Sequence, residues 1–297
     1  MTIKIKVLAS WTSSEEITKR LLDQFYIDQD LSDVEFVHDG DCDFVFNCNY
    51  EVGVNGTYQQ RYAFTMEPTW SGNYPKHFSD PKTIVYAQTS AGSDRPHNVI
   101  EHPTFMFYGS GGEGWTYKEV MDNQSYPKTK NISSIVSMLR NGMTYPCLYD
   151  ARRAAITTIL ASNVEVDVYG WDWSWFPRAK GLGRKFEGLL PYRFSLAIEN
   201  THENNYITEK FYDPILTNTI PIYFGAKNIR EIFPENGYVL IEDINDTSAL
   251  LKQLAYVNAN AESLYQTMLP ELKKIQHRFF TEFNLLNKIL KLSYVNL

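Results

Sequence analysis

The feature that most constrains this chain is the segment Tyr192–Gly225, in which two apolar runs of strand length flank a polar loop and a short helical stretch. The first run, Phe194–Ile198, ends abruptly at Glu199-Asn200, and the second run is Ile220–Phe224. A strand, a helix and a second strand in this order form a βαβ unit, whose strands lie parallel in a covered sheet. Ligands of such sheets bind at the carboxyl ends of the strands, so we expect chemistry at Glu199 and Asn200.

The predicted helix of this unit begins near Thr208, whose hydroxyl can cap it while the amides of the first turn lack intrahelical partners. Lys210 lies beside those amides, and a lysine next to free helix amides is a natural site for phosphate. Pro214 lies within the same helix, where it removes one backbone hydrogen bond and favours a kink. We therefore expect a short helix whose start binds an anion.

Three stretches of this segment resemble the donor-binding motif of the α1,3-fucosyltransferases of glycosyltransferase family ten. They read FSLAIEN, YITEKF and TIPIYFG. These enzymes transfer L-fucose from GDP-fucose to a sugar hydroxyl. The alternative is an ordinary βαβ unit whose polar residues only cap and solvate, which would explain any single residue of the motif but not the whole run. The resemblance implies an α/β protein of the GT-B type, in which two Rossmann-like domains face one cleft.

The resemblance also assigns roles to residues of the motif. It implies that Lys210 and Arg153 bind the phosphates, and that Glu209 binds hydroxyls of the ribose or the fucose. Asn200 and Tyr206 are then expected to line the donor pocket. The chemistry suits these roles, because a carboxylate accepts hydrogen bonds from two hydroxyls and paired cations offset the charge that grows on the leaving GDP.

Two adjacent arginines, Arg152 and Arg153, open a predicted helix at Asp150–Ser162. In the family that the motif resembles, an arginine near the start of this helix contacts the donor pyrophosphate. The spacing of the apolar residues favours Arg153 for this role, with Arg152 as the alternative. Either side chain can instead be solvated, but two positive charges at a helix N-terminus are unfavourable to the helix dipole, and a bound anion would compensate for them.

Glu67 is the candidate general base. It ends an aromatic strand that starts at Arg61, and Pro68 follows it. Inverting sugar transfer needs a carboxylate that takes the proton of the attacking hydroxyl while the bond between sugar and phosphate breaks. The resembled family has a similar Y/F-T-x-E pattern in its first domain. The competing interpretation is structural, with Glu67 paired to Arg61 or capping the turn that follows.

No metal or other cofactor is expected beside the donor substrate. Asp41-Cys42-Asp43 matches the Asp-x-Asp pattern with which metal-dependent glycosyltransferases hold Mn²⁺ or Mg²⁺. Two acids ahead of a buried strand are, however, more often a solvated turn. The resembled family also generally works without a metal.

The length of 297 residues exceeds the usual size of a single core, so the chain is expected to form two domains. A polar segment with a proline, Tyr126–Lys130, marks the boundary. We predict an acceptor-binding domain over residues 1–127 and a GDP-fucose-binding domain over residues 128–297. An amphipathic helix from Glu271 onwards is expected to pack back across the first domain.

The composition excludes several classes of protein. The net charge of −7 argues against nucleic-acid binding, and 43% hydrophobic residues exclude a disordered chain. Three cysteines without metal-like spacing indicate reduced thiols. The chain starts with a short alternating strand rather than a signal peptide and has no run of roughly 20 apolar residues, so we expect a soluble, cytoplasmic protein without a membrane anchor.

Together these observations predict an inverting glycosyltransferase. It would move L-fucose from GDP-fucose to a hydroxyl of an acceptor glycan, in α1,3 linkage to a GlcNAc- or Glc-type residue. Two alternatives remain open. A related transferase can use another nucleotide sugar, because a few changes in a pocket switch the sugar while the phosphate contacts stay. A non-catalytic protein that binds glycans or nucleotides can also keep the same fold.

Overall fold

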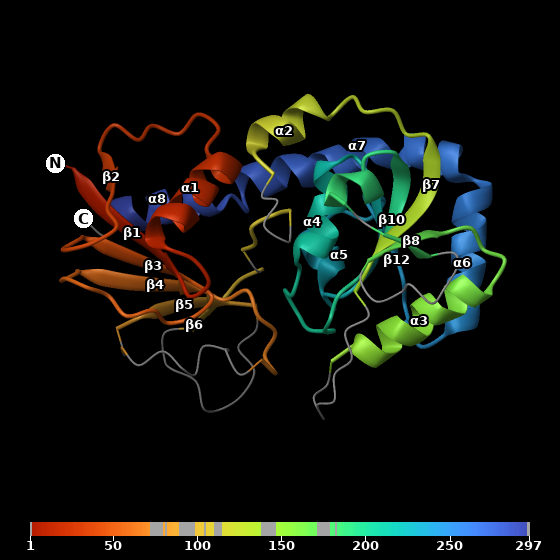
Figure 1. The fold of residues 1–297 in the computed structure, drawn as a ribbon, viewed down its shortest axis with the longest axis horizontal. Helices are drawn as coiled ribbons and strands as arrows, with labels where there is room; N and C mark the ends of the chain where they lie inside the picture. The colour runs from red at the N-terminus through yellow and green to blue at the C-terminus, as the bar shows by residue number, and fades with distance from the viewer. Residues whose placement is uncertain are drawn as a thin grey trace.

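The computed structural model of the protein contains two six-stranded sheets, which form the cores of the two lobes that lie side by side in Figure 1. The residues that it describes are 2–71, 80, 82–88, 99–103, 105–109, 115–137, 147–170, 179–181 and 183–295. Each strand pairs in parallel with its neighbours, so the carboxyl ends of the strands of one sheet share one edge. The predicted class, two parallel-sheet α/β domains, is confirmed.

The first sheet has the strand order β2-β1-β3-β4-β5-β6. All the residues of β3 are buried, as expected for a parallel strand that is covered on both faces. The strands of this sheet are β1 (Ile3–Ala9), β2 (Val34–Phe36), β3 (Phe44–Cys48), β4 (Gln60–Phe64), β5 (Ile84–Ala87) and β6 (Val99–Glu101).

Two helices from opposite ends of the chain lie together beside the first sheet. Helix α1 (Ser14–Phe25) follows β1, and helix α8 (Leu285–Val295) packs against it (Figure 1). The buried side chain of Asn284 joins them, because its Nδ2 donates to the carbonyl oxygen of Phe25 at 2.9 Å and its Oδ1 accepts from the N–H of Asn287 at 3.0 Å. The end of the chain is thus part of the first lobe.

The second sheet has the order β12-β11-β10-β7-β8-β9, with β10 between β7 and β11. Its strands are β7 (Lys130–Ile135), β8 (Asp167–Tyr169), β9 (Ala179–Lys180), β10 (Tyr192–Ile198), β11 (Ile220–Phe224) and β12 (Val239–Leu240). The remaining helices are α2 (Tyr117–Asp122), α3 (Tyr149–Ala161), a 3₁₀ turn (Lys185–Gly188), α4 (Glu209–Leu216), α5 (Ile229–Ile232), α6 (Thr247–Ala259) and α7 (Ala261–Thr281). No helix in these described parts of the chain is long and apolar enough to cross a membrane.

The βαβ unit predicted for the segment Tyr192–Gly225 is confirmed. Strands β10 and β11 pair in parallel, and α4 lies between them in sequence. Helix α4 is short, as Pro214 led us to expect: it has 8 residues, and Thr217 ends it. Because proline has no N–H, it cannot donate to the carbonyl of Lys210 one turn earlier.

The last helical region differs from the prediction. A single helix was expected from Glu271, but α7 already starts at Ala261, with Pro270 inside it, and α8 is a separate helix. The break lies at residues 282–284, where the side chain of Asn284 accepts from the N–H of Asn287 and so caps α8. The capping asparagine explains why a new helix starts at Leu285.

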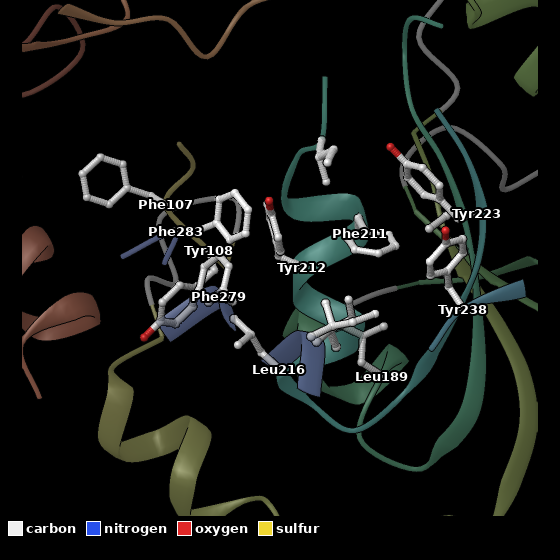
Figure 2. Packing of buried hydrophobic residues seen from close by; sticks show 14 of the residues in the cluster. Phe107, Tyr108, Leu189, Phe211, Tyr212, Leu216, Tyr223, Tyr238, Phe279 and Phe283 are labelled. Carbon is white, nitrogen blue, oxygen red and sulfur yellow. The ribbon is translucent and has the colours of Figure 1, made fainter. Parts of the chain in front are cut away.

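A cluster of aromatic side chains joins the two lobes. Tyr212 of α4 packs on Phe279 of α7 with ring centroids 4.6 Å apart, and Tyr108 lies 5.8 Å from Phe279 (Figure 2). Phe25 of α1 lies 5.7 Å from Tyr108 and 6.1 Å from Phe279. The buried core is therefore continuous from helix α1 of the first lobe to helix α4 of the second.

The segment that links the two sheets is fixed by a half-buried lysine. Lys128 Nζ donates to the carbonyl oxygens of Leu190 at 2.8 Å and Thr217 at 2.7 Å, and to Thr219 Oγ1 at 2.9 Å. Strand β7 begins two residues later, at Lys130. The two sheets thus fall on either side of the boundary predicted after residue 127, while the domain limits themselves stay a prediction.

Candidate functional site

The predicted site residues lie where the carboxyl edges of the two sheets meet. Glu67 follows β4 of the first sheet, and Asn200 follows β10 of the second. A hydrogen bond crosses between the two edges, because the N–H of Thr69 donates to Glu203 Oε2 at 3.2 Å. The fold therefore brings the candidate base and the candidate donor-binding residues to one junction.

A buried carboxylate ties the end of β10 to the start of α4. Glu199 is fully buried, and its two oxygens accept hydrogen bonds from the N–H of Thr208 at 2.8 Å and from its hydroxyl at 2.6 Å. The Thr208 hydroxyl in turn accepts from the N–H of Lys210 at 3.3 Å, which makes Thr208 the N-cap that the sequence predicts. Burial raises the pKa of Glu199, although the Lys210 ammonium counteracts this.

Gly225 is needed for this arrangement. A Cβ at this position would lie 2.4 Å from Glu199 Cγ and 2.2 Å from the hydroxyl of Tyr223, far inside van der Waals contact. The glycine at the end of β11 therefore leaves the space into which the Glu199 side chain fits.

Glu209 and Lys210 form an ion pair in the first turn of α4. Lys210 Nζ lies 3.1 Å from Glu209 Oε1 and 3.6 Å from Glu199 Oε2. Burial alone would raise the pKa of Glu209, but the ammonium groups of Lys210 and Lys185 lower it to about 2. Burial would likewise lower the pKa of Lys210, and the carboxylates of Glu209 and Glu199 raise it instead. Both side chains are therefore charged at neutral pH.

Of the two arginines at the start of α3, Arg152 faces this group. It is 4% exposed, and its guanidinium lies 5.3 Å from the ring centroid of Tyr149. Burial lowers the pKa of Arg152, while Tyr149 and the carboxylates of Glu199 and Glu209 counteract the shift, so its charge lies within range of theirs. Its Nε is a buried donor without a hydrogen-bond acceptor among the described residues. An unpartnered donor of this kind suits a site that receives an anion.

Arg153 points elsewhere. Its Nη2 pairs with Asp150 Oδ1 at 3.0 Å on the surface of α3, and a third of the side chain is exposed, at 35%. The geometry thus reverses the preference for Arg153 that the spacing of apolar residues had suggested. Hydrophobic spacing is ambiguous here because Arg152 occupies a buried position that an apolar residue normally fills.

Tyr206 and Asn200 lie against the same group. Tyr206 is buried, and burial raises its pKa, with further contributions from the charges of Glu199, Glu209 and Glu67. The backbone carbonyl oxygen of Asn200 accepts from the N–H of Leu148 at 2.8 Å. This bond fixes the start of α3 to the end of β10. The structure therefore brings Asn200, Tyr206, Glu209 and Lys210 together, with Arg152 in place of Arg153.

Glu67 is held at the edge of the first sheet and is partly exposed. Asn49 Nδ2 donates to Glu67 Oε1 at 3.2 Å. The competing interpretation paired Glu67 with Arg61, but Arg61 donates to Asn47 Oδ1 at 2.7 Å and forms an ion pair with Glu51 at 3.2 Å. The guanidinium is thus engaged by Asn47 and Glu51.

A second ion pair, which sequence analysis missed, lies on α4 one turn after Glu209. Asp213 is fully buried, pairs with Lys185 Nζ at 2.5 Å and accepts from the N–H of Gly109 at 3.0 Å. Its position four residues after Glu209 on the helix is the one signal that the sequence offers. The ion pair and the bond to Gly109 hold α4 one turn beyond Glu209.

The Asp-x-Asp turn lies at the opposite edge of the first sheet. It precedes β3, whose first residue pairs with the first residue of β4, so Asp41 and Asp43 flank the amino ends of strands that lead to Glu67 at their carboxyl ends. Asp41 Oδ1 accepts from the N–H and hydroxyl of Thr57 at 2.7 and 2.8 Å, and Asp43 Oδ2 accepts from the N–H of Lys4 at 2.8 Å. These bonds give both acids a role in closing the turn.

Comparison with known proteins shows which family the chain resembles. Residues 125–276, just over half of the chain, match the profile described as Glycosyltransferase family 10 (fucosyltransferase) C-term. A putative fucosyltransferase-like protein of Arabidopsis thaliana is 32% identical over 118 residues, and an alpha-(1,3)-fucosyltransferase of Helicobacter pylori is 26% identical over 157 residues. These matches cover 39% and 52% of this chain but 22% and 31% of the two relatives.

Solved structures share the fold over nearly the whole chain. The crystal structure of an alpha1,3-fucosyltransferase with GDP-fucose has a TM-score of 0.55 at 19% identity, over 96% of this chain and 90% of that one. A pneumococcal O-GlcNAc transferase in complex with UDP and GlcNAc has a TM-score of 0.53 at 12% identity, over 85% of this chain and 56% of that one. The arrangement of two parallel-sheet domains is that of the GT-B glycosyltransferases.

The low pKa of Glu209 predicts how stability depends on pH. A carboxylate whose pKa falls from 4.5 in the unfolded chain to about 2 in the fold stabilises the protein above pH 4.5, and this contribution is lost as the pH falls through the window between the two values. We expect Glu209→Gln to lower the thermal midpoint at pH 7, by an amount equivalent to at most about 3 kcal/mol. The difference from the wild type should shrink steadily below pH 4.5.

The measurement is the thermal midpoint of both proteins between pH 7 and pH 3. Glu35→Gln, an exposed change on β2, is the control and should leave the midpoint unchanged at each pH. A difference between the wild type and Glu209→Gln that stays constant or grows on acidification would contradict the assignment of a charged, paired Glu209.

Proposed function

The chain belongs to glycosyltransferase family 10, the fucosyltransferases, and on this premise we propose that it transfers L-fucose from GDP-fucose to a hydroxyl of an acceptor glycan. The observation that carries the proposal is the group at the start of α4. A helix N-terminus, Lys210 and the buried Arg152 with its unpartnered Nε converge beside Glu209 at the carboxyl edge of the second sheet. Two cations beside the positive end of a helix dipole favour a bound diphosphate.

The donor-binding roles follow from this placement. Lys210 and Arg152 bind the phosphates, with Arg152 taking the role that the sequence had given to Arg153. Glu209 stays ionised beside them and accepts hydrogen bonds from hydroxyls of the ribose or the fucose. Asn200 and Tyr206 line the same pocket. Because Lys210 and Arg152 supply positive charge where a metal ion would otherwise do so, we propose that the reaction proceeds without a metal.

The chemical step is an inverting displacement. The acceptor hydroxyl attacks the anomeric carbon of fucose, the bond from that carbon to the β-phosphate oxygen breaks, and the hydroxyl proton passes to the carboxylate of Glu67. GDP leaves with the electron pair of the broken bond, and Lys210 and Arg152 stabilise the negative charge that develops on it. A β-linked donor thus gives an α-linked product. The acceptor lies against the carboxyl edge of the first sheet, and an α1,3 linkage to a GlcNAc- or Glc-type residue is the product we propose.

A thermal-shift titration tests the donor. GDP and GDP-fucose should raise the midpoint, because only a ligand that binds the folded state stabilises it, by about 2.7 kcal/mol at a concentration of 100 times the dissociation constant. UDP and ADP should have no effect, and EDTA should change nothing. Stabilisation by UDP or ADP, or a requirement for a divalent metal, would assign a different nucleotide donor. Stabilisation by GDP with no hydrolysis of GDP-fucose would indicate a binding protein.

Arg152 and Arg153 offer a matched pair of variants. Arg152→Met should weaken GDP binding by about tenfold to a hundredfold, because it removes a charge-assisted hydrogen bond to the phosphates. Arg153→Met removes the same charge from the surface of α3 and should weaken binding by less than about threefold, as expected for an exposed charge that salt screens. Isothermal titration with GDP measures both. An equal loss in the two variants, or a larger loss in Arg153→Met, would return the phosphate role to Arg153.

Replacing the base separates binding from chemistry. Glu67→Gln should lower kcat for transfer by about 10²- to 10⁴-fold, because the amide cannot accept the hydroxyl proton, while the dissociation constant of GDP-fucose stays the same. Glu35→Gln on the same sheet is the control for the loss of one negative charge. Wild-type turnover in Glu67→Gln would remove this residue from the mechanism.

A further inference from the structure

The loop that carries the donor motif reaches across to the first sheet through Asn205. This residue has a left-handed backbone conformation, with φ of 60°. Its Nδ2 donates to the carbonyl oxygen of Gln88, which follows β5 of the first sheet, at 2.6 Å. The two residues are 117 positions apart in the chain and belong to different lobes.

Asn228 holds the Asn205 side chain in this orientation. Asn228 Nδ2 donates to Asn205 Oδ1 at 2.9 Å, and Asn228 Oδ1 accepts from the N–H of Asn205 at 2.7 Å. Because the side-chain oxygen of Asn205 is occupied by a donor from its own lobe, its NH₂ group is left to point at the other lobe. Glycine would satisfy the left-handed backbone equally well, but it would provide no such group.

The chain of hydrogen bonds continues from Gln88 to the candidate base. The side chain of Gln88 is fully buried, and its Nε2 donates to the backbone carbonyl oxygen of Glu67. Asn49 holds the same segment from the other side, since its Oδ1 accepts from the N–H of Met66 at 3.0 Å and its Nδ2 donates to the Glu67 carboxylate at 3.2 Å. Glu67 is thus held by Asn49 within the first lobe and by Gln88, whose own backbone carbonyl accepts from Asn205 of the donor-binding lobe.

A second contact between the lobes runs beside this chain. The N–H of Thr69 donates to Glu203 Oε2 at 3.2 Å, and Glu203 Oε1 accepts from the hydroxyl of Thr201 at 2.8 Å. The loop between Asn200 and Tyr206 therefore contacts two residues near the candidate base. One is Gln88, which bonds to Glu67, and the other is Thr69, two residues after Glu67 in the chain.

We propose that Asn205, supported by Asn228 and acting through Gln88, is a positioning residue that fixes Glu67 relative to the donor. The inference rests on the proposed transfer reaction. In that reaction the base belongs to one lobe and the anomeric carbon is held by the other, so the distance between them depends on contacts that cross the junction. A general base must lie within about 2.6 to 3.2 Å of the proton it removes. A misplacement of about 1 Å can lower the rate by about a hundredfold.

Asn205→Asp is the sharpest test, because the two side chains have the same shape. The aspartate keeps the oxygen that accepts from Asn228 and tolerates the left-handed conformation, but it places an acceptor where the amide donated to the Gln88 carbonyl. We expect kcat for transfer to fall by between about tenfold and a hundredfold. The dissociation constant of GDP, measured by thermal shift, should stay within about twofold of the wild-type value, because Asn205 is not placed among the phosphate-binding residues.

Asn236→Asp is the matched control. Asn236 also has a left-handed backbone, with φ of 71°, but it is exposed on the loop before β12. The same change of charge there should leave kcat and the GDP dissociation constant unchanged. Loss of activity in both variants would attribute the effect to added negative charge and overturn the inference.

A second variant tests the chain of bonds itself. Gln88→Met removes the hydrogen bond to the Glu67 carbonyl with little change in volume and should also lower kcat. If both residues act on Glu67 through one chain of hydrogen bonds, kcat of the double variant should be only slightly lower than kcat of the less active single variant. Full kcat in Asn205→Asp, fully additive losses, or an equal loss of GDP affinity would each overturn the positioning role while leaving the proposed function intact. Absence of transfer by the wild-type protein with GDP-fucose would overturn both.

Discussion

The site depends on one buried carboxylate, Glu199, that bonds to both the N–H and the hydroxyl of Thr208. Burying a carboxylate costs several kcal/mol of free energy unless its oxygens accept hydrogen bonds. Once strand β10 has buried Glu199, its oxygens therefore need the donors that Thr208 provides. This contact fixes the first turn of α4 at the carboxyl edge of the second sheet. Glu209 and Lys210 follow directly in the chain, and their positions are therefore determined by the strand rather than by a mobile loop.

The other side of α4 belongs to the junction between the lobes. Tyr212 packs on Phe279, and Asp213 accepts from the backbone of Gly109. The helix that presents the donor-binding residues is thus also the helix that the aromatic cluster holds against the first lobe (Figure 2). A short helix can do both because Glu209 and Lys210 at its start face different neighbours from Tyr212 and Asp213. This links the packing of the core to the distance between the two halves of the site.

The features that the sequence predicted correctly depend on residues that are close together in the chain. The βαβ unit, the Thr208 cap and the shortness of α4 follow from apolar runs, a capping residue and a proline that are close together in the sequence. The identity of the buried arginine did not follow, because Arg152 occupies a position that apolar spacing reserves for the core. The partners of Glu67 could not be predicted either, since Asn49 and Gln88 come from neighbouring strands whose order only the folded sheet reveals.

Basic and acidic side chains already lie next to one another in the site before any donor binds. Arg152, Lys185 and Lys210 lie among Glu199, Glu209 and Asp213, so this pocket does not attract a diphosphate by a large excess of positive charge. The advantage of this pocket is instead that its lysine is already held in place. Lys210 is held by Glu209 at 3.1 Å and by the Thr208 hydroxyl at 3.3 Å. A free lysine loses up to about 2 kcal/mol of side-chain entropy when it is fixed, and in this fold the acids have already fixed it. The carboxylates that oppose phosphate binding by charge therefore favour it by holding the cation in place.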